Sequence, residues 1–206
     1  MKTTILVGVG EFHRVPHLVF MDLEFTCWEG SLKSNWSDPS RPPEVLEIGL
    51  AAYDTQTGQI LSTFSSLVRP RLNAQLSAYC TNLLRIAQAD INQAPTLIDV
   101  VDRIINWENE LGLFHAPTAS WGIEDRLYLT GDTLRAGCVE PFVNRPHLDL
   151  MSVASALVDF PKGERMGRDD VRKILKLPPL TNRHTGLADA LDLVCFYLAL
   201  KQKAGG

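Results

Sequence analysis

The segment from His17 to Glu24 constrains the fold most, because it reads as a buried strand that ends in two acidic residues. Side chains alternate along a strand, so the carboxylates of Asp22 and Glu24 point to the same face of the sheet. Burying two like charges side by side costs free energy unless a cation or hydrogen bonds compensate. A divalent metal is the simplest compensation, since hard cations take oxygen ligands. The alternative is a half-exposed edge strand with solvated acids.

The order of the remaining elements predicts an α/β domain. Strands are expected at residues 44–53 and 60–68, joined by a short turn that contains Gly58, as in an antiparallel hairpin. Two shorter strands, 118–121 and 147–150, alternate with helical segments later in the chain. A hairpin followed by alternating strands and helices makes a mixed sheet with helices packed on its faces. The expected helices span residues 76–88, 96–111, 123–136, 152–158, 168–175 and 186–203.

The chain is long enough for one well-buried domain. Its 206 residues divide into an N-terminal segment, 1–16, to which no role is assigned, and a single domain at 17–203. Residues 25–43 contain several glycines and prolines and are expected to form a loop. Apolar spacing predicts the inward-facing side chains of two helices. These are Ile98, Val101, Ile104, Ile105 and Leu111 in the helix at 96–111, and Leu187, Leu191, Val194, Cys195 and Leu198 in the last helix.

Composition favours a protein of the cytoplasm without a membrane partner. No apolar stretch approaches the ~20 residues that span a bilayer. A short apolar run in residues 1–10 ends at Glu11 without a cleavage site, so no secretion signal is expected. The four cysteines are widely spaced and form no Cys-x-x-Cys pair, which argues against a disulfide framework or a structural zinc site and favours a reducing compartment.

The net charge of −4 argues mildly against a nucleic-acid-binding protein, which usually shows a basic surface. The objection weakens if the acidic residues are metal ligands, because bound cations neutralise them locally. A basic run occurs late in the chain, and such runs usually form a solvated helix face. Its members are Lys162, Arg165, Arg168, Arg172, Lys173, Lys176 and Arg183.

Three further residues are candidates for chemistry. Asp125 lies in the first turn of the helix expected after the short strand at 118–121, where capping and the helix dipole alone would favour a carboxylate. His184 and Asp189 are five residues apart, so in a regular helix their side chains would diverge by ~140°. They can converge if His184 lies on the loop before the last helix, a bend that Gly186 permits. A lone histidine is otherwise more often structural.

Taken together, these residues resemble the DEDDh branch of the ribonuclease-H-like 3′-to-5′ exonucleases. That branch carries Asp-x-Glu on the first strand, an Asp at the start of a middle helix and His-x-x-x-x-Asp near a late helix. The matching positions here are Asp22, Glu24, Asp125, His184 and Asp189. The resemblance implies a mixed five-stranded sheet, with its first three strands antiparallel, flanked by helices.

Within that branch the chain is similar to the subgroup of the enhanced-RNAi and histone-message exonucleases, from about residue 17 to 200. The similarity is carried by residues 22–29, 44–48, 68–70, 76–77, 80–83 and 184–189. Two departures stand out. Leu84 and Arg85 replace a usual Thr-Gly near the expected substrate path, and Phe25 occupies a position that is often small.

The resemblance implies an enzyme that binds two Mg²⁺ or Mn²⁺ ions per active site. Asp22 would bridge the ions, Glu24 and Asp189 would hold the first, and Asp125 would hold the second. His184 would act as general base on the attacking water, a role that suits histidine near neutral pH. Glu24 is counted with His184 among the catalytic and substrate-contacting residues.

The expected substrate is single-stranded or 3′-overhanging nucleic acid, with RNA favoured over DNA. Phe25 or Trp28 would stack on the terminal base, as in other single-strand binders, although packing beneath the loop explains each ring equally well. Three alternatives remain: a DNA-directed exonuclease of the same branch, a non-catalytic nucleic-acid-binding module, and an unrelated α/β fold with accidental acids. The physiological substrate and the oligomeric state are not indicated.

Overall fold

The computed structural model describes residues 15–34, 36–160, 167–180 and 184–205. Predictions for residues 1–14 and for three members of the basic run, Lys162, Arg165 and Arg183, lie outside the described residues. The first strand begins at His17 and the last helix ends at Lys203.

The predicted mixed sheet is confirmed. Its strands are β1 (His17–Phe25), β2 (Val45–Asp54), β3 (Gln59–Leu67), β4 (Thr118–Ser120) and β5 (His147–Asp149), in the spatial order β3-β2-β1-β4-β5. β1, β2 and β3 pair antiparallel, whereas β4 adds to β1, and β5 to β4, in parallel. β1 therefore lies at the centre of the sheet and is buried along most of its length, which excludes the edge-strand alternative.

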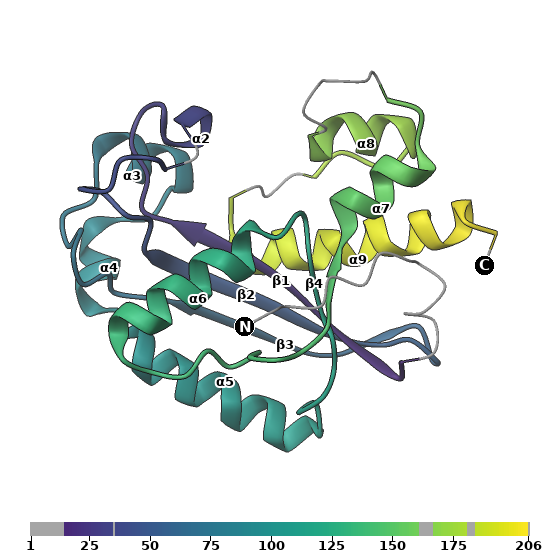
Figure 1. Cartoon of the computed structure of the whole chain (residues 1–206), viewed down its shortest axis with the longest axis horizontal. Coiled ribbons are helices and arrows are strands. Elements are labelled where there is room, and N and C mark those ends of the chain that lie inside the picture. The colour runs from purple at the N-terminus through teal and green to yellow at the C-terminus, as the bar shows by residue number, and fades with distance from the viewer. Residues whose placement is uncertain (1–14, 35, 161–166, 181–183, 206) are drawn as a thin grey trace.

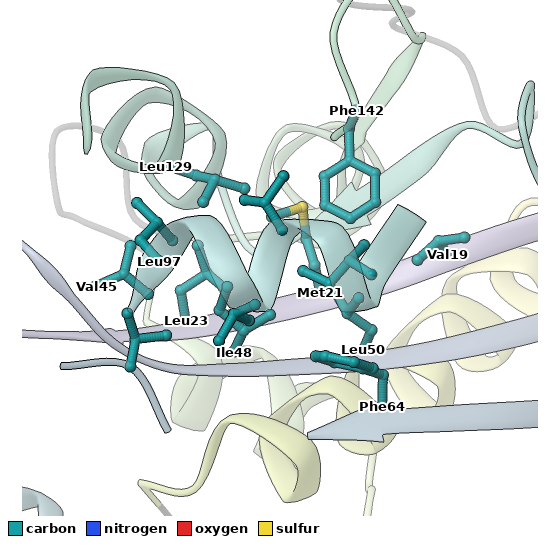
Figure 2. Close-up of a cluster of buried hydrophobic side chains, with 14 of the residues drawn as sticks. Val19, Met21, Leu23, Val45, Ile48, Leu50, Phe64, Leu97, Leu129 and Phe142 are labelled. Carbon is teal, nitrogen blue, oxygen red and sulfur yellow. The ribbon is translucent and has the colours of Figure 1, made fainter. Parts of the chain in front are cut away.

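Helices cover both faces of the sheet, as Figure 1 shows. Alternate β1 residues, including Leu18 and Phe20, pack with Leu193 and Tyr197 of α9 (Gly186–Lys203) and with α7 (Leu150–Leu157) and α8 (Arg168–Ile174). The intervening β1 residues, Val19, Met21 and Leu23, face α5 (Leu97–Leu111) and α6 (Glu124–Ala136), a cluster drawn in Figure 2. The side chains on both faces of β1 pack against helices, so its residues from Leu18 to Met21 are all apolar and show no alternation of apolar and polar residues.

One predicted helix is wrong in its extent. Within the segment at 76–88, α3 (Ala78–Leu84) ends early, and a second short helix, α4 (Gln88–Gln93), begins at its last residue. Ser77 caps the start of α3 by accepting a hydrogen bond from the Cys80 amide, and Arg85 ends it in the left-handed conformation. A further short helix, α2 (Ser31–Ser34), interrupts the loop predicted at 25–43.

The predicted inward faces of two helices need correction. In α5, Val101 and Ile104 are buried as predicted, whereas Ile98 and Ile105 are exposed. Leu97 and Val100 are the buried residues that the prediction missed. In α9, Cys195 and Leu198 are exposed, and the buried side chains include Leu193, Phe196 and Tyr197. The α9 prediction failed because this helix is apolar nearly all round and packs against both the sheet and α7, so apolar spacing does not select one stripe. Among the described helices, none combines the length and the apolar character needed to cross a membrane.

Candidate active site

β1 carries Asp22 and Glu24 to the face of the sheet that α9 covers. The alternation that points Leu18 and Phe20 into the α9 core continues through these two acids at the carboxyl end of the strand. Asp22 is only 5% exposed, and the pairing of β1 with β2 becomes irregular directly after Glu24. The two carboxylates therefore lie where the buried part of the strand meets the end of the sheet.

The first turn of α9 brings Asp189 to the same place. It can approach closely because two glycines meet beneath it: a Cβ built on Gly49 of β2 would lie 1.9 Å from the carbonyl carbon of Gly186. A Cβ built on Gly186 would likewise lie 3.0 Å from the backbone carbonyl oxygen of Asp22. Carboxylate oxygens of Asp22, Glu24 and Asp189 consequently all lie within 4.8 Å of one another.

Glu47 is a fourth carboxylate beside this group that the sequence did not single out. It pairs directly opposite Glu24 across β1 and β2, and its side chain is 8% exposed. The Gly186 amide at the start of α9 donates a hydrogen bond to it. An acceptor at a helix N-terminus satisfies an otherwise unpaired amide, so Glu47 helps to hold α9 against β2.

Asp125 reaches the site from α6. Its Oδ1 accepts a hydrogen bond of 3.2 Å from the backbone N–H of Leu23, the residue between the two β1 acids. The pairing of β4 with β1 covers only Val19 and Phe20, so β1 continues beyond its neighbour on that side. Asp125 thus takes the place of a missing strand partner, and this contact fixes it beside Asp22 and Glu24.

His184 lies on the turn before α9, as the predicted convergence with Asp189 requires. Its backbone is left-handed, with φ of 63°, and its N–H donates a hydrogen bond of 2.9 Å to Oδ2 of Asp189. The imidazole is exposed and lines the cavity that also contains Asp22 and Asp125. The structure therefore brings together all five residues of the predicted set.

Burial raises the pKa of three carboxyl groups at the site. The pKa of Asp22 lies well above its ordinary value because of desolvation, and the pKa of Glu24 rises to about 8 because of burial and the neighbouring charges of Asp189 and Glu47. Burial likewise raises the pKa of Asp125 to about 7. A hard divalent cation binds such closely packed oxygen atoms, and its charge stabilises the ionised form of the carboxylates. The donor set therefore fits Mg²⁺ or Mn²⁺.

Arg168 is a site residue that the sequence analysis missed. Its Nη1 lies 3.0 Å from Oδ1 of Asp22 and 3.1 Å from Oδ1 of Asp189. Although burial lowers the pKa of Arg168, these carboxylates raise it above its ordinary value. In the same helix Arg172 is buried and paired with Asp192. The prediction of a solvated face is thus wrong for these two members of the basic run and holds for Lys173, which is exposed.

A cavity of about 340 Å³ opens beside the carboxylates and has an apolar wall. Phe25 lines it and packs edge-on against Tyr128, with ring centroids 5.2 Å apart. Leu84, one of the two departures from the subgroup, also lines it, whereas Arg85 is the residue that ends α3. Other side chains that form the wall include Trp36, Tyr79, Leu83 and Trp121.

Trp28 lies elsewhere. It is absent from the described lining of this cavity, and the Arg41 guanidinium lies 5.4 Å from the centre of its ring. Trp28 instead lines a separate hollow together with Glu29, Ser34, Asp38 and Arg41. Of the two rings predicted to stack on a terminal base, the structure brings Phe25 to the carboxylates and leaves Trp28 outside. Substrate contact by either ring stays a prediction.

Comparisons with known proteins agree with this geometry. A family model described as "Exonuclease" (RNase_T) matches residues 19–196. The Homo sapiens protein "ERI1 exoribonuclease 3" is 26% identical over 188 residues, which are 87% of this chain and 52% of the relative. The Homo sapiens "3'-5' exoribonuclease 1" is 33% identical over 91 residues, which are 44% of this chain and 24% of the relative.

A solved nuclease domain, that of "3'hExo, a DEDDh family member, bound to rAMP", superposes with a TM-score of 0.73. It is 24% identical, and the match covers 94% of both chains. This likeness confirms the predicted ribonuclease-H-like fold. The chain spans about half the length of the first curated relative above and about a quarter of the second.

Proposed function

The chain belongs to the RNase_T exonuclease family, and from this premise we propose that it is a metal-dependent 3′-to-5′ exonuclease acting on RNA ends. The relatives confirm the predicted resemblance to the exoribonuclease subgroup. One observation carries the proposal: three carboxylates from the first strand and the last helix, two of them buried, converge within 4.8 Å beside a histidine and an apolar cavity.

The carboxylates would hold the divalent ions. Asp22, Glu24 and Asp189 form the group in which one ion fits, and Asp125, anchored on β1, is the ligand that we assign to a second. Two bound ions would supply charge stabilisation at the attacking and leaving oxygens of the phosphodiester. Asp22 is the residue suited to bridging, since it interacts electrostatically with both Asp125 and Asp189.

His184 would take the proton from the attacking water. Its backbone is tied to Asp189 through the 2.9 Å hydrogen bond, which leaves the imidazole at the mouth of the cavity. A base at this position would take a proton from water, and the resulting hydroxide would attack phosphorus. The bond from phosphorus to the 3′-oxygen of the preceding nucleotide would then break. That oxygen would take up a proton from solvent, and the terminal nucleotide would leave as its 5′-monophosphate.

The apolar wall would receive the terminal base. Phe25 and Tyr128 offer aromatic surface directly beside Glu24, which suits a base whose own phosphate lies at the carboxylates. RNA is favoured over DNA because the curated relatives are named exoribonucleases. The cytoplasm is the location that we propose, and the four free cysteines are consistent with a reducing compartment.

The test is a gel time course with a 5′-labelled single-stranded RNA and its DNA counterpart, in Mg²⁺, Mn²⁺ or EDTA. We expect a metal-dependent ladder that shortens from the 3′ end, faster on RNA, and lost in Asp22→Ala. Asp102→Ala is the matched control, since it removes an exposed carboxylate from α5 without touching the site. Full activity in well-folded Asp22→Ala would remove the mechanism. Binding of both strands without shortening would favour a non-catalytic module.

A further inference from the structure

The guanidinium of Arg168 contacts two carboxylates of the proposed metal site. One nitrogen, Nη1, contacts Oδ1 of Asp22 at 3.0 Å and Oδ1 of Asp189 at 3.1 Å. These two residues belong to the group of three whose oxygens lie within 4.8 Å of one another. Arg168 therefore lies against two of the three carboxylates that a divalent ion needs.

We propose that Arg168 is an exchangeable counter-cation, which neutralises the metal-free centre and is displaced from Asp22 and Asp189 when divalent ions bind. The inference rests on the proposed metal centre and adds a positioning residue to it. A guanidinium is permanently charged and carries only donors, so it cannot join the ligands of a metal ion and competes with the ion for these carboxylates. Two cations at the same carboxylate oxygens repel each other, and the ion with the higher charge prevails.

Charge balance explains why the centre needs such a residue. Asp22 and Asp189 are 5% and 4% exposed, so water screens their charges poorly. Glu24 and Asp125 add further carboxylates close by. Without a cation, a buried group of this kind is strongly destabilising. Arg168 supplies one positive charge to the two carboxylates that are most deeply buried.

The structure also provides a place for the displaced side chain. Arg168 is the first residue of α8, and its side chain is 31% exposed. It lines the catalytic cavity and also a second cavity of about 460 Å³, whose wall includes the acidic residues Asp169 and Asp170 and the basic residues Arg172 and Lys173. A guanidinium that turns into this second cavity would remain near acidic side chains.

The first measurement is the thermal stability of Arg168→Gln in EDTA. Lys173→Gln is the matched control, because it removes the same charge from an exposed position of the same helix. We expect the Tm of metal-free Arg168→Gln to fall by roughly 3–8 °C relative to this control, and saturating Mn²⁺ to close the gap. Equal Tm values for the two variants in EDTA would overturn the counter-cation role.

The second measurement is Mn²⁺ affinity by titration calorimetry, which needs no turnover. Arg168→Gln removes the competitor, so we expect Mn²⁺ to bind about tenfold more tightly than to wild type, whereas Lys173→Gln changes the affinity by about twofold or less. Arg168→Lys, which keeps the charge but loses the planar group, should fall between them. Unchanged or weaker binding in Arg168→Gln would refute the exchange. A wild type that binds no Mn²⁺ would instead overturn the metal centre itself, and the exchange with it.

Discussion

Replacing Gly49 by alanine should disable the site without touching any of its chemical groups. The added Cβ would lie 1.9 Å from the Gly186 carbonyl carbon and 2.1 Å from the Leu187 nitrogen. These are backbone atoms of α9, and both belong to its first turn, so no flexible side chain can turn aside. The helix would have to retreat from β2, taking Asp189 and the His184 amide with it.

The expected size follows from the overlap. Real Cβ contacts below 3.0 Å are essentially absent, so the start of α9 must shift by roughly 1 Å or more, and a misplacement of that size can cost about 100-fold in rate. Overpacking a core costs about 1–3 kcal/mol, and a clash with backbone belongs at the upper end. We therefore expect turnover to fall about 100-fold and the Tm to drop by roughly 6–12 °C.

The assay pairs exonuclease time courses with thermal and urea unfolding of the same protein preparations. Gly131→Ala is the matched control: it lies within α6, where the nearest atom to a new Cβ is the flexible Arg135 Nη1 at 3.4 Å. This control should gain up to about 1 kcal/mol from helix propensity and keep its activity. Wild-type turnover and stability in Gly49→Ala would refute the argument that backbone contact sets the position of α9.

Three further predictions concern single side chains. His184→Ala should lower kcat by about 10²–10⁴-fold while metal affinity changes by less than about twofold, because the backbone N–H of His184 makes the hydrogen bond to Asp189 and the substitution keeps it. Single-turnover rates and calorimetry measure the two quantities, and an unchanged rate would refute the general base. His147, buried between Thr118 and Ser120, has its pKa lowered to about 4 by burial, so its contribution to stability is complete above pH ~6.5 and is lost as the pH falls toward 4. Urea unfolding should show wild type losing up to about 3 kcal/mol relative to His147→Gln across that window, whereas parallel pH curves would contradict the shift. Phe25→Ala should raise KM for RNA about tenfold, and Trp28→Ala by less than about twofold, because Phe25 lines the catalytic cavity and Trp28 does not. The reverse order in steady-state assays would assign the stacking to Trp28.

The sequence predicted the parts of the site that local geometry determines. Strand alternation alone places Asp22 and Glu24 on one face, and the spacing of His184 and Asp189 predicted that the histidine must precede the helix. Asp125 was harder to assign to the site, because helix capping explains a carboxylate in the first turn equally well. Its hydrogen bond to Leu23 depends on where β4 stops pairing with β1, which no local pattern encodes.

The residues that were missed act through contacts between distant segments. Arg168 meets Asp22 across 146 residues of sequence, and in a basic run it cannot be told from its solvated neighbour Lys173. Glu47 and Gly49 occupy ordinary strand positions, and their roles depend on the docking of α9. The inward face of that helix was predicted correctly at Val194 but wrongly at Cys195 and Leu198. Apolar residues surround the helix, so its packed neighbours decide which of them are buried.

The closure of the site by α9 has a consequence for folding. Asp22 and Glu24 belong to the first described strand, whereas Asp189 and the Gly186 contact come from the last described helix. Until α9 docks, the chain has no complete set of carboxylates, and the site cannot form. Because these contacts join segments that lie far apart in the sequence, they close a long loop, which makes their formation a slow step in folding. The proposed activity would therefore appear only once α9 has docked on the sheet.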